Sequence, residues 1–287
     1  MDAYHVHSES TRSNVNHPFI NFFHKPIMIY YFVDPFCQQC WELERYMKKL
    51  TMEYGAFFNV RPIISHIYNE SPHRLLDKKE ENHIIHNGDH LNKYYGFISI
   101  KAAALQGNKA GRDFLRSVQE AIFLYNKNES IHDILAHSVE NTNLDIREFE
   151  NDLLSSSAKK AYESDIQLMH EMDVNQYPTL VFFSQHNEEY SVKVSGLQTY
   201  DAYTFVLKKM LHFELTNFSK PTIEACFIQY GRLQTEEIAF IFDLSEKEAE
   251  KKLKQLQLMQ KVKQVVINGI LFWEYCGQNK AEVHQND

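Results

Sequence analysis

The sequence predicts a mixed α/β protein with two parts, a larger domain built on a sheet and a small module of helices with a β-hairpin. Three observations predict it: a strand, a helix and a strand open the ordered chain; a long helical segment then precedes two more strands; and three short helices with a hairpin end it. We therefore expect a flexible tail over 1–25, a domain over 26–214 with a helical insertion at about 96–172, a module over 220–276 and a tail over 277–287.

Composition limits the class of protein before any motif is considered. The 287 residues are 44% hydrophobic, which is enough for one large or two modest cores. A net charge of −8 argues against nucleic acid or an anionic membrane as the main partner. No apolar run approaches the roughly 18–20 residues that span a bilayer, and the N-terminus lacks the apolar segment of a secretory signal. Four cysteines are too few for a disulfide scaffold, so we expect a cytoplasmic protein.

The first strand is the run 26–33, PIMIYYFV, whose continuous apolar and β-branched character is typical of a strand buried on both faces near the centre of a sheet. Apolar residues then recur at helical spacing over 38–54, and Gly55 is a plausible stop signal. The run 56–64 is a second strand. Its short connection to the helix predicts a parallel crossover unit.

The rest of the domain is less regular. Residues 65–95 are polar and predict a short exposed helix or a loop, whereas 96–172 are helical throughout. Strands at 179–184 and 190–195 and a helix at 200–212 complete this part.

The C-terminal module is predicted from caps and a turn. Its three helices are expected at 221–231, 235–243 and 245–258, the last opened by a capping box of Ser245 and Glu248. The dipeptide Asn268-Gly269 predicts a two-residue hairpin turn. That turn sets a register in which Ile267 faces Ile270, Val265 faces Phe272 and Lys263 faces Glu274. Helices followed by a hairpin describe a winged-helix-like module. From Thr216 to the C-terminus the chain carries nine bases and ten acids, and this balance favours protein over nucleic acid as partner.

Cys37 and Cys40 carry the clearest chemical signal. A strand, a C-x-x-C pair and a helix are what thioredoxin-like redox sites require, because the helix N-terminus favours the thiolate of the first cysteine. The second cysteine lies one turn on and can resolve a mixed disulfide. Pro178, just before the strand 179–184, occupies the place of the cis-proline in such folds. Gln38 and Gln39 offer no charge to activate the thiol, so two interpretations remain open: a redox-active pair, or an inherited dithiol without a main role.

Four stretches together resemble a known family. The stretches FVDPFCQQCWELE, KAAALQGNKAGRDFLRSVQEAIF and EMDVNQYPTLVFF, with the C-terminal module, are similar to the YjbH-type adaptor proteins of the DsbA-like thioredoxin superfamily over about residues 26–276. The resemblance implies a DsbA-like fold and a non-catalytic adaptor that binds the transcription regulator Spx in the bacterial cytosol. It also implies that the adaptor promotes degradation of Spx by the ClpXP protease. The alternative is a cytosolic thiol–disulfide oxidoreductase or redox sensor that uses Cys37 and Cys40, with Pro178 as its cis-proline.

Partner and metal candidates are weaker. Trp41, directly after the dithiol, and Tyr177, before Pro178, are candidate partner contacts. Members of the family can carry a histidine-rich, zinc-associated N-terminus. In this chain His5 and His7 are the weak candidates, since the N-terminal histidines are loosely spaced with no cysteine among them. We therefore expect no cofactor.

Overall fold

The structure is a computed structural model, and the part of the chain that it describes is 4–6, 25–67, 84–125, 129–185, 190–211 and 221–277. It divides into two compact units, the first of Met1–Leu43 with Phe57–Phe213 and the second of Glu44–Ala56 with Glu214–Asp287. The second unit therefore includes part of a helix that the sequence analysis placed within 26–214.

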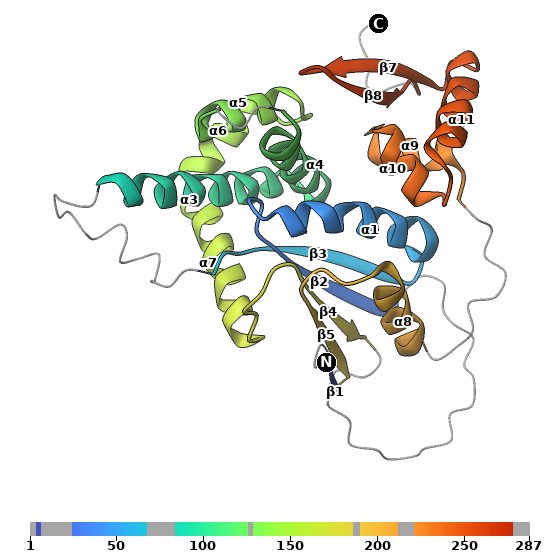
Figure 1. The fold of residues 1–287 in the computed structure, drawn as a ribbon. Coiled ribbons are helices and arrows are strands. Elements are labelled where there is room, and N and C mark those ends of the chain that lie inside the picture. The colour runs from blue at the N-terminus through green and yellow to red at the C-terminus, as the bar shows by residue number, and fades with distance from the viewer. Residues whose placement is uncertain are drawn as a thin grey trace, which may run out of the picture. The chain divides into compact units, whose positions relative to one another are not determined.

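The first unit contains a five-stranded sheet with several helices around it (Figure 1). Its strands are β1 (Tyr4–Val6), β2 (Ile27–Val33), β3 (Phe58–Ile64), β4 (Thr179–Ser184) and β5 (Ser191–Ser195). Its helices are the start of α1 (Gln38–Tyr54), then α3 (Ile84–Leu105), α4 (Asn108–Glu120), the π-helix η1 (Ala121–Tyr125), α5 (Ile131–Glu140), α6 (Ile146–Leu154), α7 (Ser156–Glu171) and α8 (Tyr200–Leu211).

The sheet has the strand order β1-β5-β4-β2-β3, with β2 and β3 parallel and the other pairs antiparallel. The strand β2 is thus an interior strand and mostly buried, which confirms the prediction for the run 26–33. A strand–helix–strand crossover followed by an antiparallel β4 and β5 confirms the predicted thioredoxin fold. At the opposite edge β1 pairs with β5, whereas the sequence analysis expected a tail there, because three residues are too short to show a strand period.

Both faces of this sheet are covered. On one face Tyr31 donates a hydrogen bond to the carbonyl oxygen of Cys40 at 3.0 Å, which joins β2 to the start of α1. On the other face Phe32, Ile63 and Met169 belong to one buried cluster that joins β2 and β3 to α7. The alternation of side chains along β2 therefore explains why both faces of the strand are apolar.

Asp165 of α7 binds the outer edge of β3, the last strand of the sheet. Its carboxylate is buried, accepts a hydrogen bond from the backbone N–H of Ile64 at 2.8 Å and pairs with Lys101 at 2.6 Å. Burial raises the pKa of Asp165, and the Lys101 ammonium acts against that rise. These two bonds of Asp165 connect the helical insertion to the edge strand β3.

The helical insertion follows the prediction with one correction at its start. The helix α3 begins at Ile84, earlier than the expected 96, because polar residues hide its first turns. Serine or aspartate side chains cap the N-termini of α5, α6 and α7, as their residue types favour: Ser130, Asp145 and Ser155. No helix in the described part of the chain is long and apolar enough to cross a membrane.

The C-terminal module forms three helices and a three-stranded antiparallel sheet of order β6-β8-β7. Its elements are α9 (Ile223–Tyr230), β6 (Arg232–Leu233), α10 (Thr235–Ile241), α11 (Glu246–Leu258), β7 (Val262–Ile267) and β8 (Ile270–Tyr275). This is the element order of a winged helix. The strand β6 was not predicted, because two residues carry no period.

The hairpin has the predicted register. Ile267 pairs with Ile270, and Lys263 pairs with Glu274, whose charged groups lie 2.8 Å apart. The capping box at the start of α11 is also present, since Ser245 and Glu248 bond to each other's backbone N–H groups. The turn and cap residues were therefore sufficient to predict the register of the hairpin and the start of α11.

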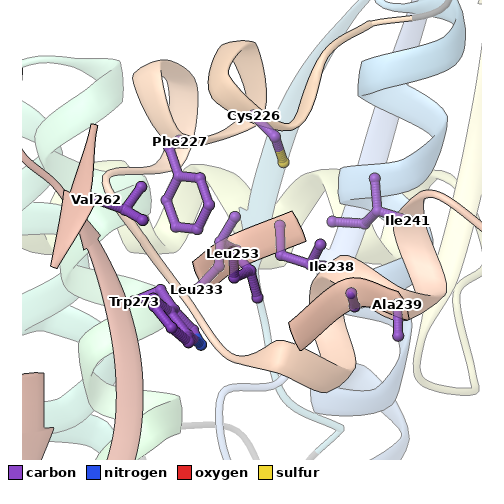
Figure 2. Packing of buried hydrophobic residues seen from close by; sticks show 10 residues of the cluster. Cys226, Phe227, Leu233, Ile238, Ala239, Ile241, Leu253, Val262 and Trp273 are labelled. Carbon is purple, nitrogen blue, oxygen red and sulfur yellow. The ribbon is translucent and has the colours of Figure 1, made fainter. Parts of the chain in front are cut away.

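The module has a core of its own, in which Phe227, Leu233, Leu253, Val262 and Trp273 converge from helices and strands (Figure 2). The indole N–H of Trp273 donates to the hydroxyl of Thr235 at 3.0 Å, so its single polar atom is satisfied.

The α1 residues of the second unit add two buried cations to it. Lys48 pairs with Glu237 at 2.6 Å, and Lys49 pairs with Asp243. Both lysine side chains are almost fully buried, so each depends on its carboxylate partner.

Candidate functional site

The dithiol lies where β2 gives way to α1. The carbonyl of Asp34 accepts a hydrogen bond from the N–H of Cys37 at 3.0 Å, and this turn places Cys37 immediately before the first residue of α1. The N–H of Trp41 then donates to the carbonyl of Cys37 at 3.1 Å, as the first helical bond. Cys37 is half-buried and Cys40 is buried, and neither is in a disulfide. The outer thiol is thus at the helix N-terminus, where free N–H groups favour an anion.

The two thiols have opposite protonation behaviour. A hydrogen bond from the Cys40 thiol, helped by the backbone N–H groups of Cys40 and Gln39, lowers the pKa of Cys37 to about 6, against burial and the Asp34 charge. Burial raises the pKa of Cys40 far above its usual value, and the neighbouring Cys37 raises it further. At neutral pH the pair therefore consists of an outer thiolate and an inner thiol that donates to it.

Asp34 has a partner that the sequence analysis missed. One carboxylate oxygen accepts from the N–H of Phe36 at 2.9 Å, which caps the turn that follows β2. The other oxygen lies 2.5 Å from Nδ1 of His66, just beyond the end of β3. The ring of His66 also stacks on Phe97. Asp34 and His66 are 32 positions apart in the chain, so only the parallel pairing of β2 and β3 brings them together.

Tyr177 and Pro178 lie beside this site. The Tyr177–Pro178 peptide bond is cis, and β4 begins at the next residue. The Tyr177 hydroxyl donates to the buried hydroxyl of Ser65 at 2.8 Å. Burial raises the pKa of Tyr177, and the nearby charges of Asp34 and the cysteines raise it further. Tyr177 is half-buried, and its hydroxyl lies between the Ser65 hydroxyl and the sulfur of Met169.

The side chain of Trp41 contacts an aromatic side chain of the helical insertion. Its indole stacks on Phe123 of η1, with ring centroids 6.1 Å apart and planes 20° apart. Both side chains are partly exposed. A π-helical turn shifts the side chains that follow it, and such turns recur at functional sites. The sequence shows the helix but not this irregular turn, so Phe123 was not a candidate.

The metal candidates are largely outside the described residues. His7 is among those not described, and for His5 the structure gives only its backbone pairing with Lys193 in β1 and β5. Elsewhere in the described ranges no three histidine, cysteine or carboxylate side chains are grouped as metal ligands. By number alone, the imidazoles of His5 and His7 are fewer than the four ligands of a structural zinc site, so these two residues could not complete one by themselves.

The comparisons with known proteins match most of the chain. The thioredoxin family matches residues 30–205. A ClpXP adapter protein SpxH from Shouchella clausii is 38% identical over 267 residues, which cover 88% of this chain and 89% of that one. The protein of the same name from Bacillus subtilis is 38% identical over 273 residues, with 87% and 89% covered.

Solved structures are similar at lower identity. A putative protein disulfide isomerase from Nitrosomonas europaea has a TM-score of 0.49 and 16% identity, and covers 64% of this chain and 97% of that one. The oxidoreductase DsbA1 of Neisseria meningitidis has a TM-score of 0.46 and 11% identity, with 73% and 92% covered.

Proposed function

The chain belongs to the SpxH family of ClpXP adapter proteins and carries a domain of the thioredoxin family, and on this premise we propose that it binds the transcription regulator Spx and promotes its degradation by the ClpXP protease. One observation carries the proposal: the SpxH relatives match 87–90% of this chain and 89–93% of their own length. The likeness therefore extends past residue 205, where the match to the thioredoxin family ends, and into the C-terminal module.

The surface beside the dithiol is the proposed client contact. Trp41 with Phe123, and Tyr177 near the cysteines, are partly exposed aromatic residues carried by helices and by the segment that leads into a strand. Aromatic side chains contribute much of the binding energy in protein interfaces. An adaptor has to hold a client only long enough to raise its effective concentration at the protease, and such a surface meets that need.

Reconstituted proteolysis tests the proposal. Purified Spx and ClpXP are incubated with and without the chain, and loss of Spx is followed by gel. We expect degradation to accelerate by at least about tenfold, which corresponds to about 1.4 kcal/mol. The double variant Cys37→Ala with Cys40→Ala should keep that acceleration, because the adaptor role needs no thiol. No acceleration by the unmodified chain would refute the proposal.

The second candidate function is a cytosolic thiol–disulfide oxidoreductase or redox sensor. It is favoured by the protonation of the pair, since Cys37 has a pKa of about 6 and Cys40 remains a thiol that can resolve a mixed disulfide. Insulin reduction with dithiothreitol tests it. Turnover lost in the double variant, while Spx degradation is unaffected, would assign both functions to one chain; no turnover would leave the adaptor alone.

We further propose a cytoplasmic location, since ClpXP acts on a cytosolic regulator. The division into 26–214 and 220–276 also stays a proposal, and limited proteolysis with mass spectrometry of the fragments tests it. Any zinc held by His5 and His7 would need ligands from elsewhere. Metal analysis of the purified chain decides this, with a His5→Ala variant as control.

A further inference from the structure

The outward side of α11 presents lysines. Lys247, Lys251 and Lys254 recur at intervals of four and three residues, and Leu258 follows after four more, so all four share one side of the helix. Ala249 and Leu253 are buried in the core of the module on the opposite side. We call Lys247, Lys251, Lys254 and Leu258 the lysine stripe.

Two of the three lysines of the stripe form no ion pair within the described part of the chain. Lys254 pairs with Glu250 at 2.7 Å, whereas no ion pair forms between Lys247 or Lys251 and any residue that the structure describes. Glu248, on the other flank of the stripe, is occupied by its capping bonds to Ser245. The stripe is thus a local positive surface on a chain of net charge −8.

Leu258 gives the stripe an apolar end. Its side chain is 85% exposed, and the neighbouring Met259 is 64% exposed. Both are at the last turn of α11, where the chain turns toward β7. A leucine so exposed at the end of a polar helix contributes little to the core, and it is available to bury apolar area against a partner.

We propose that the lysine stripe is a docking site for an acidic segment of a partner protein, with an apolar side chain of that segment placed on Leu258. This deepens the proposed adaptor function on which it rests, because an adaptor must contact a second protein besides its client. The complementarity is electrostatic: an acidic segment is attracted to the stripe and repelled by the net negative charge of the rest of the chain.

A protein segment fits the stripe better than a nucleic acid. DNA affinity requires many phosphate contacts, and the stripe offers three lysines of which one already pairs with Glu250. Leu258 would meet no apolar group on a phosphate backbone.

Fluorescence anisotropy with a labelled peptide tests the proposal. The probe carries three glutamates and a leucine at the helical spacing of the stripe and is titrated with the full chain. The variant is Lys247→Glu with Lys251→Glu, and the matched control is Lys159→Glu with Lys160→Glu, exposed lysines in the first turn of α7. Lys247 is in the first turn of α11, where glutamate suits the helix, so the variant should fold.

We expect the stripe variant to weaken peptide binding by at least about tenfold and the control by less than about twofold. Equal loss in both variants, or no binding by the unmodified chain, would overturn the proposal. So would binding of a DNA duplex that the stripe variant loses while peptide binding is unchanged. The two proposals fail separately: Spx degradation without peptide binding removes only the docking site, and stripe-dependent peptide binding without Spx degradation removes only the adaptor function.

Discussion

Replacing Cys40 with alanine should change the acidity of Cys37. The hydrogen bond from the Cys40 thiol is the largest cause of the low pKa of Cys37, about 6, and alanine removes that donor. The backbone N–H groups of residues 39 and 40 remain, so the pKa should move part of the way to the ordinary thiol value of about 8.5. We expect a rise of at least about one unit, which is about 1.4 kcal/mol of lost thiolate stabilisation.

The midpoint of the pH profile is a better observable than the rate at one pH. With a pKa of about 6, about 90% of Cys37 is thiolate at pH 7, and at about 8.5 only about 3% would be, so a full shift reduces the reactive fraction about 30-fold. A thiolate of higher pKa is also about 10- to 18-fold more nucleophilic for that shift. The two effects nearly cancel at pH 7, where the rate should fall only about two- to threefold.

The assay is alkylation by iodoacetamide between pH 4.5 and 9.5, read by mass spectrometry of the Cys37 peptide. Cys276 is exposed and would compete for reagent, so all variants carry Cys276→Ser. Cys40→Ser is the matched control, because its hydroxyl still donates and the midpoint should stay near 6. If Cys40→Ala and Cys40→Ser both leave the midpoint at about 6, the inner thiol does not set the acidity of the outer one.

Three further predictions concern folding, each measured by urea unfolding. Asp165→Ala should destabilise the first unit by about 3–5 kcal/mol, because it leaves Lys101 without its buried partner and Ile64 without an acceptor. Trp273→Ala should cost about 3–5 kcal/mol in the second unit, since a fully buried ring is lost from its core. Gly269→Ala should cost about 1–2 kcal/mol in the second unit, because its φ of +81° is unfavourable for a residue with a Cβ and, apart from its chain neighbours, nothing in the described part of the chain lies within 4 Å of that Cβ.

Each of these has a matched control. Asp113→Ala removes an exposed pair with Lys109 and should change stability by less than about 0.5 kcal/mol. Leu271→Ala, in the same strand as Trp273 but 43% exposed, should cost less than about 1 kcal/mol. Gly269→Asn should cost less than the alanine variant, because asparagine tolerates this conformation better. Equal losses in variant and control would contradict the assigned cause.

The parts that the sequence predicts well are those with a local chemical cause. Asn268-Gly269 predicts a two-residue turn, and that turn determines which residues of β7 and β8 pair in the hairpin. Ser245 with Glu248 marked the start of α11. The apolar run 26–33 showed that its strand is interior, because only a strand buried on both faces needs no polar alternation.

The parts that were missed depend on contacts between distant residues. His66 meets Asp34 only through the pairing of two strands, and Phe123 meets Trp41 only through a π-helical turn. Neither residue stands out in the sequence, since a histidine after a strand and a phenylalanine in a helix are common. The candidate site was therefore predictable in its cysteines and its proline, but not in the groups that surround them.

The bond between Asp165 and Ile64 also has a consequence for self-association. An outermost strand of a sheet ordinarily offers free amide hydrogens on which another chain can add a strand. Along β3 every second residue directs its backbone nitrogen away from β2, so the nitrogens of Pro62 and Ile64 both lie at the outer edge. The N–H of Ile64 already donates to Asp165, and Pro62 has no N–H. This end of β3 therefore offers few free amide hydrogens to which another strand could bind. The Asp165 carboxylate thus helps to prevent fibrils from growing at this edge of the sheet.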